Sequence, residues 1–179
     1  MQNSIIGIII FFLALMQASF LPNIFPLYFV PDVVLIFVII WTARSDFNSA
    51  LKWAVLGGLV IDLISFFPIG ISIFSFVLIA FMVNSLSKRF LVPDFAWKFI
   101  VLFFIVFLAT IVNQFVTMFL VKISSGVGIR ESIEYARSNG LLWKPFSNLL
   151  IFVIIYWPIR KLDKFLSYQN KRVVIKRHA

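Results

Sequence analysis

Long runs of apolar residues, separated by short polar or proline-containing segments, dominate the pattern of this chain. A helix rises about 1.5 Å per residue, so roughly 20 apolar residues cross the ~30 Å hydrocarbon core of a bilayer. Most of the runs approach this length. The pattern therefore predicts an all-α integral membrane protein with about six transmembrane helices. The predicted spans are residues 4–21, 32–43, 50–67, 71–86, 96–123 and 141–159.

Prolines and polar residues mark the predicted connections between these spans. Three prolines in residues 22–31 push the residues before them out of helical geometry, which predicts an irregular or re-entrant linker that ends at Pro31. The span 32–43 is too short to cross a bilayer alone. Pro68 and Gly70 predict a tight turn between the third and fourth spans. The other predicted connections are residues 44–49, 87–94 and 124–140.

Basic residues are distributed unevenly between the two sides of a six-span topology. If both termini are cytoplasmic, the outer segments hold only four of the 16 Lys and Arg residues, and the inner segments hold the other twelve. The outer four are Lys122, Arg130, Arg137 and Lys144. The positive-inside rule therefore predicts cytoplasmic termini. We expect one transmembrane domain, residues 1–162, followed by a basic cytoplasmic tail, residues 163–179.

Composition narrows the functional classes further. The chain is 62% hydrophobic and 13% charged, has no cysteine, and carries its single histidine, His178, next to its last residue. Disulfides, thiolate nucleophiles and histidine-based sites in the membrane domain are therefore excluded. The net charge of +9 would favour nucleic acid in a soluble protein, but in a membrane protein it favours anionic lipid at the inner face. We expect no catalytic residue, cofactor, metal or nucleic-acid partner.

Asp62 is the acidic residue inside the third predicted span. Ala54, Gly58, Asp62 and Ser65 fall on one helical face, and the small residues there would permit a neighbouring helix to approach closely. One interpretation is a proton relay or ligand contact, and the other is a polar clamp between helices. We favour the clamp, because no second acid or histidine is nearby in sequence. Asparagine is then expected to replace Asp62 without loss of folding.

Asp32 follows Pro31 at a predicted helix start. A carboxylate there can accept backbone N–H groups and oppose the positive end of the helix dipole. We therefore predict that Asp32 caps the helix that it begins.

A polar stripe runs along the fifth predicted span. Thr110, Asn113, Gln114 and Thr117 follow an i, i+3, i+4, i+7 spacing and so share one face of the helix. Such a stripe either lines a pocket or hydrogen-bonds to adjacent helices, and the sequence leaves both interpretations open. Gln17 and Asn148 are single polar groups in other spans and predict no site by themselves.

An ordered set of short motifs resembles a known family. Residues 31–35 read Pro-Asp-Val-Val-Leu and begin a predicted helix. Residues 57–65 read Gly-Gly-Leu-Val-Ile-Asp-Leu-Ile-Ser, and Pro68-Ile69-Gly70 follows them. This order resembles the bacterial rod shape-determining protein MreD family, and Trp157-Pro158 before basic residues is similar to that family's C-terminal end. The candidate structural or partner-binding residues are Pro31, Asp32, Gly57, Gly58, Asp62, Pro68, Gly70, Asn113 and Gln114.

The resemblance implies a non-enzymatic component of the elongation complex in the bacterial inner membrane. Such a protein would control rod shape and lateral peptidoglycan synthesis by binding an MreC-like bitopic membrane protein, with MreB and peptidoglycan synthases as further partners. Self-association is left open.

The alternative is the substrate-binding S component of an energy-coupling-factor vitamin transporter, a fold that MreD proteins resemble. Those components use an Ala-x-x-x-Ala face, and Ala14 and Ala18 have this spacing. However, the pair lies in the outer half of its predicted span, on the wrong side for a cytoplasmic transport module. A third class, a membrane enzyme, would need paired acids or an acid with a histidine.

Overall fold

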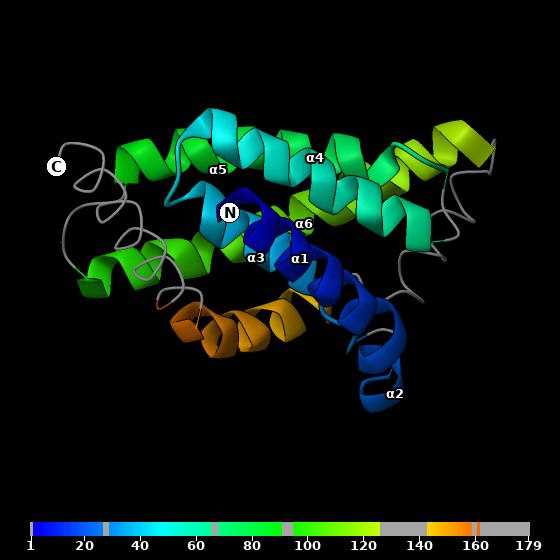
Figure 1. Ribbon diagram of the computed structural model, residues 1–179, viewed down its shortest axis with the longest axis horizontal. Coiled ribbons are helices and arrows are strands. Elements are labelled where there is room, and N and C mark those ends of the chain that lie inside the picture. The colour runs from blue at the N-terminus through cyan, green and yellow to red at the C-terminus, as the bar shows by residue number, and fades with distance from the viewer. Residues whose placement is uncertain are drawn as a thin grey trace, which may run out of the picture.

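The computed structural model describes residues 2–26, 29–65, 68–90, 95–125, 143–158 and 161, and within these ranges every regular element is helical (Figure 1). The all-α prediction is thus confirmed for the described chain. The elements are α1 (Gln2–Leu15), the π-helical turn η1 (Met16–Phe20), α2 (Leu21–Ile24), α3 (Val33–Thr42), α4 (Phe47–Ile64), α5 (Ile71–Phe90), α6 (Phe95–Ser125) and a last, unlabelled helix at residues 144–158.

Four of these helical stretches are long and apolar enough to cross a membrane. They are Ser4–Ile24, Phe47–Ile64, Ile71–Phe90 and Phe99–Ile123. Because so many of their large apolar side chains are exposed on the outside of the bundle, lipid is the solvent that suits this surface. The chain is a multi-pass membrane protein.

The first helix continues further than the sequence predicts. In place of a linker that starts at residue 22, η1 carries the helix onward into α2, which ends at Ile24. The N–H of Leu21 bonds to the carbonyl of Met16, and Pro22 then occupies the first turn of α2. Proline is tolerated in a first turn, since its missing N–H would have no partner there. Of the predicted linker, only the part after Ile24 remains.

Other helices also begin or end at residues that differ from the predicted ones. Helix α4 begins at Phe47, three residues before the predicted start, and ends at Ile64. Helix α5 continues to Phe90, so Lys88 and Arg89 lie in its last turn rather than in a separate loop. Basic side chains are favourable there because they oppose the negative end of the helix dipole. Most of the predicted 124–140 loop and all of the tail 163–179 fall outside the described residues.

Helix α3 is the centre of the bundle. All ten of its residues are buried, and it contacts α1, α4, α5 and α6 (Figure 1). A helix that is apolar on every side belongs inside a protein, because it has no polar face to turn outward. This burial explains how so short an apolar helix is accommodated, since protein rather than lipid surrounds it.

Helices α4 and α5 form a closely packed antiparallel pair. A Cβ atom built on Gly58 would lie 2.5 Å from the Cα of Ile73 and 2.7 Å from its backbone nitrogen. Only glycine permits this approach. Pro68 and Gly70 lie in the connection, and Gly70 has a φ of 110°, a conformation that side-chain-bearing residues rarely adopt.

Candidate functional site

The carboxylate of Asp62 binds the start of the next helix. Its Oδ2 accepts the N–H of Gly70 at 2.7 Å and that of Ile73 at 3.3 Å, and its Oδ1 accepts the N–H of Ser72 at 2.9 Å. Asp62 is only 2% exposed. The first N–H groups of a helix have no partner within the helix and lie at the positive end of its dipole. Asp62 therefore clamps the α4–α5 turn through backbone groups.

This geometry revises what asparagine can do at the same position. Both oxygens of Asp62 accept backbone N–H groups. Asparagine has one acceptor oxygen, and its amide nitrogen is a donor that would face another donor. On these contacts we expect Asp62→Asn to lose stability, contrary to the expectation from the sequence.

Asp32 begins α3 but does not cap it. Its side chain makes no cap hydrogen bond, so the predicted capping role is wrong. The side-chain oxygen of Gln17, in η1, takes that role by accepting the N–H of Val34 at 3.1 Å. The Asp32 backbone, with φ −88° and ψ 78°, also departs from the extended conformation typical of capping residues.

The Asp32 carboxylate instead joins two other segments of the chain. Its Oδ1 accepts the side-chain N–H of Gln17 at 3.2 Å and lies 3.1 Å from the Nζ of Lys144. Its backbone N–H donates to Oδ1 of Asn148 at 2.7 Å. The start of α3 is therefore held from both sides, by η1 and by the last helix.

Asn148 extends this polar contact to α6. The fully buried side chain donates from Nδ2 to the hydroxyl of Thr110 at 3.0 Å, and that hydroxyl donates to the carbonyl of Val106 at 2.8 Å. Asn113 lies three residues after Thr110 in α6, and its Oδ1 accepts a hydrogen bond from the hydroxyl of Ser75 in α5. Part of the α6 stripe therefore hydrogen-bonds between helices, which is one of the two interpretations left open by the sequence.

The same end of the bundle contains a cavity of about 330 Å³, called here the Asp32 cavity. Seven polar and five apolar side chains line it. The lining residues are Gln17, Ala18, Val30, Asp32, Ile61, Ile64, Ser65, Ser72, Phe76, Asn113, Thr117 and Lys144. Thus Asn113 and Thr117 of the stripe also fit the other interpretation, that of a pocket lining.

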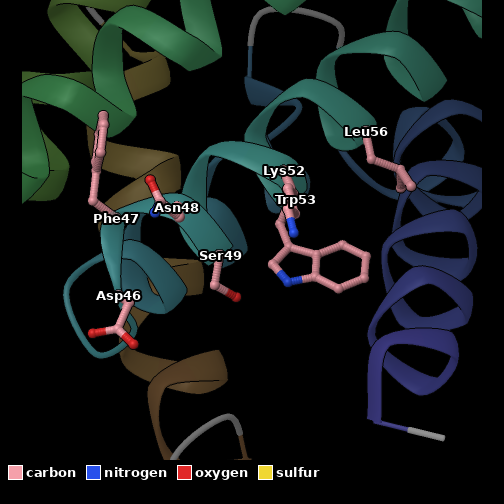
Figure 2. Close-up of a pocket in the computed structure, with 7 residues that line it drawn as sticks. All are labelled: Asp46, Phe47, Asn48, Ser49, Lys52, Trp53 and Leu56. Carbon is pink, nitrogen blue, oxygen red and sulfur yellow. The ribbon is translucent and has the colours of Figure 1, made fainter.

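A second hollow, of about 700 Å³, lies at the opposite end of α4. Figure 2 shows its lining residues, which come from the first ten residues of α4, as far as Leu56, and from Asp46 before it. The Trp53 indole points toward α1, where a Cβ on Gly7 would lie 3.8 Å from the ring, and Lys52 and Asp46 are exposed (Figure 2). The hollow is an open surface feature with one exposed acid and one exposed base.

The structure distributes the candidate residues over two neighbouring places. Asp62, Pro68 and Gly70 belong to the α4–α5 connection, and Gly57 and Gly58 lie buried along the same pair of helices. Pro31, Asp32 and Asn113 lie at or beside the Asp32 cavity, whereas Gln114 is half-buried and does not line it. Asp32 and Asn113 are themselves part of the cavity lining.

Sequence reasoning missed Gln17, Asn148 and Lys144 as partners of Asp32. A signal was present, because an uncharged polar side chain in an apolar span is costly unless it finds a partner. The partner itself could not be identified, since Asn148 and Asp32 are 116 residues apart.

Among the residues that the structure describes, no group of three or more His, Cys, Asp or Glu side chains could hold a metal ion. The polar groups of the site join segments of the chain to one another: carboxylate and amide oxygens accept N–H groups, and the ammonium of Lys144 pairs with Asp32.

Comparison with known proteins agrees with the motif order. The family model of the rod shape-determining protein MreD matches residues 2–166. Searches of curated proteins and of solved structures returned no significant match, so the likeness to S components stays a prediction. The family model covers nearly the whole chain and every described helix, and the chain therefore belongs to the rod shape-determining protein MreD family.

Proposed function

We propose that this rod-shape-determining membrane protein is a non-catalytic scaffold of the complex that elongates rod-shaped bacteria. It acts by binding partner proteins, first of all an MreC-like bitopic membrane protein, with MreB and peptidoglycan synthases in the same assembly. Membership of the MreD family over residues 2–166 is the observation that carries this proposal. A location in the bacterial inner membrane follows from the same function.

The contacts of the polar side chains support a scaffold. Asp62, Asn148 and Thr110 use their polar groups to join helices to one another. A protein that works as a rigid binding surface needs helices held in one arrangement, and buried hydrogen bonds between helices provide that.

The orientation belongs to the proposal as well. Arg44 follows the end of α3, Lys52 lies in the first half of α4, and Lys88 and Arg89 end α5. In a bundle of alternating helices, these residues share one end, and the Asp32 cavity lies at the other. The positive-inside rule places the basic end in the cytoplasm, against anionic lipid, and with it both termini.

The S-component alternative has one supporting feature, the Asp32 cavity, because a substrate-binding component needs a cavity for its ligand. Ala14 argues against it. This residue is fully buried in the bundle core beside Ile10, so it cannot present an Ala-x-x-x-Ala face to a transport module.

Affinity purification of the tagged chain in mild detergent tests the two functions. The scaffold predicts recovery of a bitopic MreC-like protein, and depletion of the chain should make rod-shaped cells round. Recovery of paired ATPases with a bound vitamin, together with normal cell shape, would reverse the assignment.

A further inference from the structure

We propose that the Asp32 cavity binds a small zwitterion that carries a primary ammonium group beside an anionic oxygen group. An ethanolamine phosphodiester has this chemistry, either as the headgroup of a phospholipid or as a free molecule such as glycerophosphoethanolamine. The proposal is independent of the partner-binding function, because it concerns a ligand of the isolated chain.

The first observation is an unpaired oxygen. Asp32 is 9% exposed and lines the cavity, and its Oδ2 is buried with no hydrogen-bond partner in the described chain. Its other oxygen, Oδ1, already accepts from Gln17 and Lys144. A buried carboxylate oxygen without a donor is costly, so a ligand donor that gains access to Oδ2 would stabilise the site. A primary ammonium supplies such a donor with the matching charge.

The second observation is the cation beside it. Lys144 lines the same cavity, is partly exposed at 28%, and uses one contact on Asp32. An ammonium group has three N–H donors, so others are free for a second acceptor. An anionic oxygen on the ligand fits this position. Thr117 also lines the cavity and adds a hydroxyl that can donate to the same oxygen.

Charge balance selects a zwitterion over a simple ion. Asp32 and Lys144 neutralise each other at 3.1 Å, so a ligand of net charge would leave an uncompensated charge inside the bundle. A ligand with one positive and one negative group places its ammonium beside Asp32 and its anionic oxygen beside Lys144. Each ligand charge then faces its complement, and the site stays neutral.

The pocket is also braced for binding. Gln17 uses its amide oxygen on Val34 and its amide nitrogen on Asp32, while Asn148 holds the backbone of Asp32. The carboxylate is therefore fixed before any ligand arrives, which lowers the entropy lost on binding. A volume of about 330 Å³ lies at the small end of ligand sites, which span roughly 300–1,000 Å³.

Access is available at the mouth of the cavity. Ala18 and Ile64 line it and are themselves exposed. A lipid headgroup could enter there while its acyl chains remain outside, and a small soluble zwitterion could enter through the same opening.

The test uses the full chain purified in detergent and measures its thermal unfolding with four probes. Glycerophosphoethanolamine and a short-chain phosphatidylethanolamine carry the ammonium, whereas glycerophosphocholine and the matching phosphatidylcholine have the same charges but no N–H. At concentrations a hundredfold above Kd, either ammonium probe should raise Tm by about 5 °C or more. The choline probes should raise it by less than a third as much.

The two ammonium probes identify the source. Binding of the lipid at least tenfold tighter than the free headgroup assigns the ligand to the membrane, and equal or weaker binding of the lipid assigns it to solution. If neither probe raises Tm, water alone fills the cavity and the proposal fails. It also fails if the choline probes raise Tm equally.

Two variants with a matched control locate the effect. Ala18→Phe narrows the cavity without removing any hydrogen bond of the network and should abolish the Tm rise. Ser19→Phe makes a comparable enlargement at the neighbouring exposed position, outside the lining, and should retain it. Lys144→Gln should weaken binding about tenfold or more. An unchanged rise in Ala18→Phe would place the ligand elsewhere and overturn the assignment. Lys144→Gln also removes the cation beside Asp32. If Lys144→Gln fails to fold for that reason, the result with Ala18→Phe decides.

Discussion

Asn148 accepts the backbone N–H of Asp32 at 2.7 Å, across 116 residues of sequence. The same amide side chain donates to Thr110, so one residue of the last helix joins the start of α3 to the middle of α6. The two bonds can form together only where these three segments meet at one level of the bundle.

Asn148→Leu should lower the stability of the folded chain by about 1–3 kcal/mol, because it leaves the Asp32 N–H buried without a partner. Thermal unfolding in detergent measures the effect. Gln114→Leu is the control, since Gln114 shares the α6 stripe and is half-buried but makes no side-chain hydrogen bond within the described part of the chain. Equal Tm values for the two variants would contradict the structural role of Asn148.

Asp62→Asn should destabilise the chain by about 1–3 kcal/mol, and Asp62→Leu by more. The asparagine retains one acceptor for three N–H groups, and the leucine retains none. Asp46→Asn is the matched control, because Asp46 is exposed and makes no side-chain cap bond at the start of α4. If Asp62→Asn unfolds at the wild-type temperature, the three backbone bonds do not stabilise the turn.

Gly58→Ala and Gly57→Ala should differ sharply although the glycines are neighbours. A Cβ on Gly58 meets backbone atoms of Ser72 and Ile73 at 2.5–2.9 Å, which requires a shift of the whole helix and should cost about 1–3 kcal/mol. On Gly57 it meets a methyl carbon of Val34 at 3.2 Å, which can move by a few tenths of an ångström. Differential unfolding of the two variants measures the contrast, and a larger loss for Gly57→Ala would contradict the packing described.

Asn23 and Asn48 should report opposite sides of the membrane. Both are exposed, Asn23 near the end of α2 and Asn48 at the start of α4, and the chain has no cysteine of its own. After Asn23→Cys or Asn48→Cys, an impermeant thiol reagent added to intact cells should label only position 23. Labelling of position 48 alone would invert the proposed orientation, and labelling of both would contradict the topology.

The helices of this fold could be predicted largely from the sequence, because lipid forces long apolar runs into helices. The ends of these helices are harder to predict. The π-helical turn that continues the first helix through Pro22 depends on a local change of hydrogen bonding that no residue pattern announces. The extra turn of α5 contains Lys88 and Arg89, whose charges resemble those of a loop.

The site could be predicted only in part. The sequence identifies Asp62 as a contact residue, because an acid inside an apolar span needs a partner. The sequence favoured another helix as that partner, but it did not indicate that the backbone at the α5 start would provide the donors. Proximity predicts that Asp32 caps its own helix, whereas Gln17, 15 residues away from Asp32, provides that cap. Pairing over such distances depends on how helices pack, and single-residue patterns carry no information about it.

The burial of α3 has a consequence for how the chain is made. Ten helical residues span about 15 Å, half of the hydrocarbon core, and the residues just before them, 30–32, are not helical. When α3 leaves the ribosome, the helices that surround it from the C-terminal side have not been synthesised. Its place in the membrane is therefore decided late, when α4, α5 and α6 enclose it. A chain that stops after Thr42 therefore contains α3 without α4, α5 and α6, three of the helices that bury it.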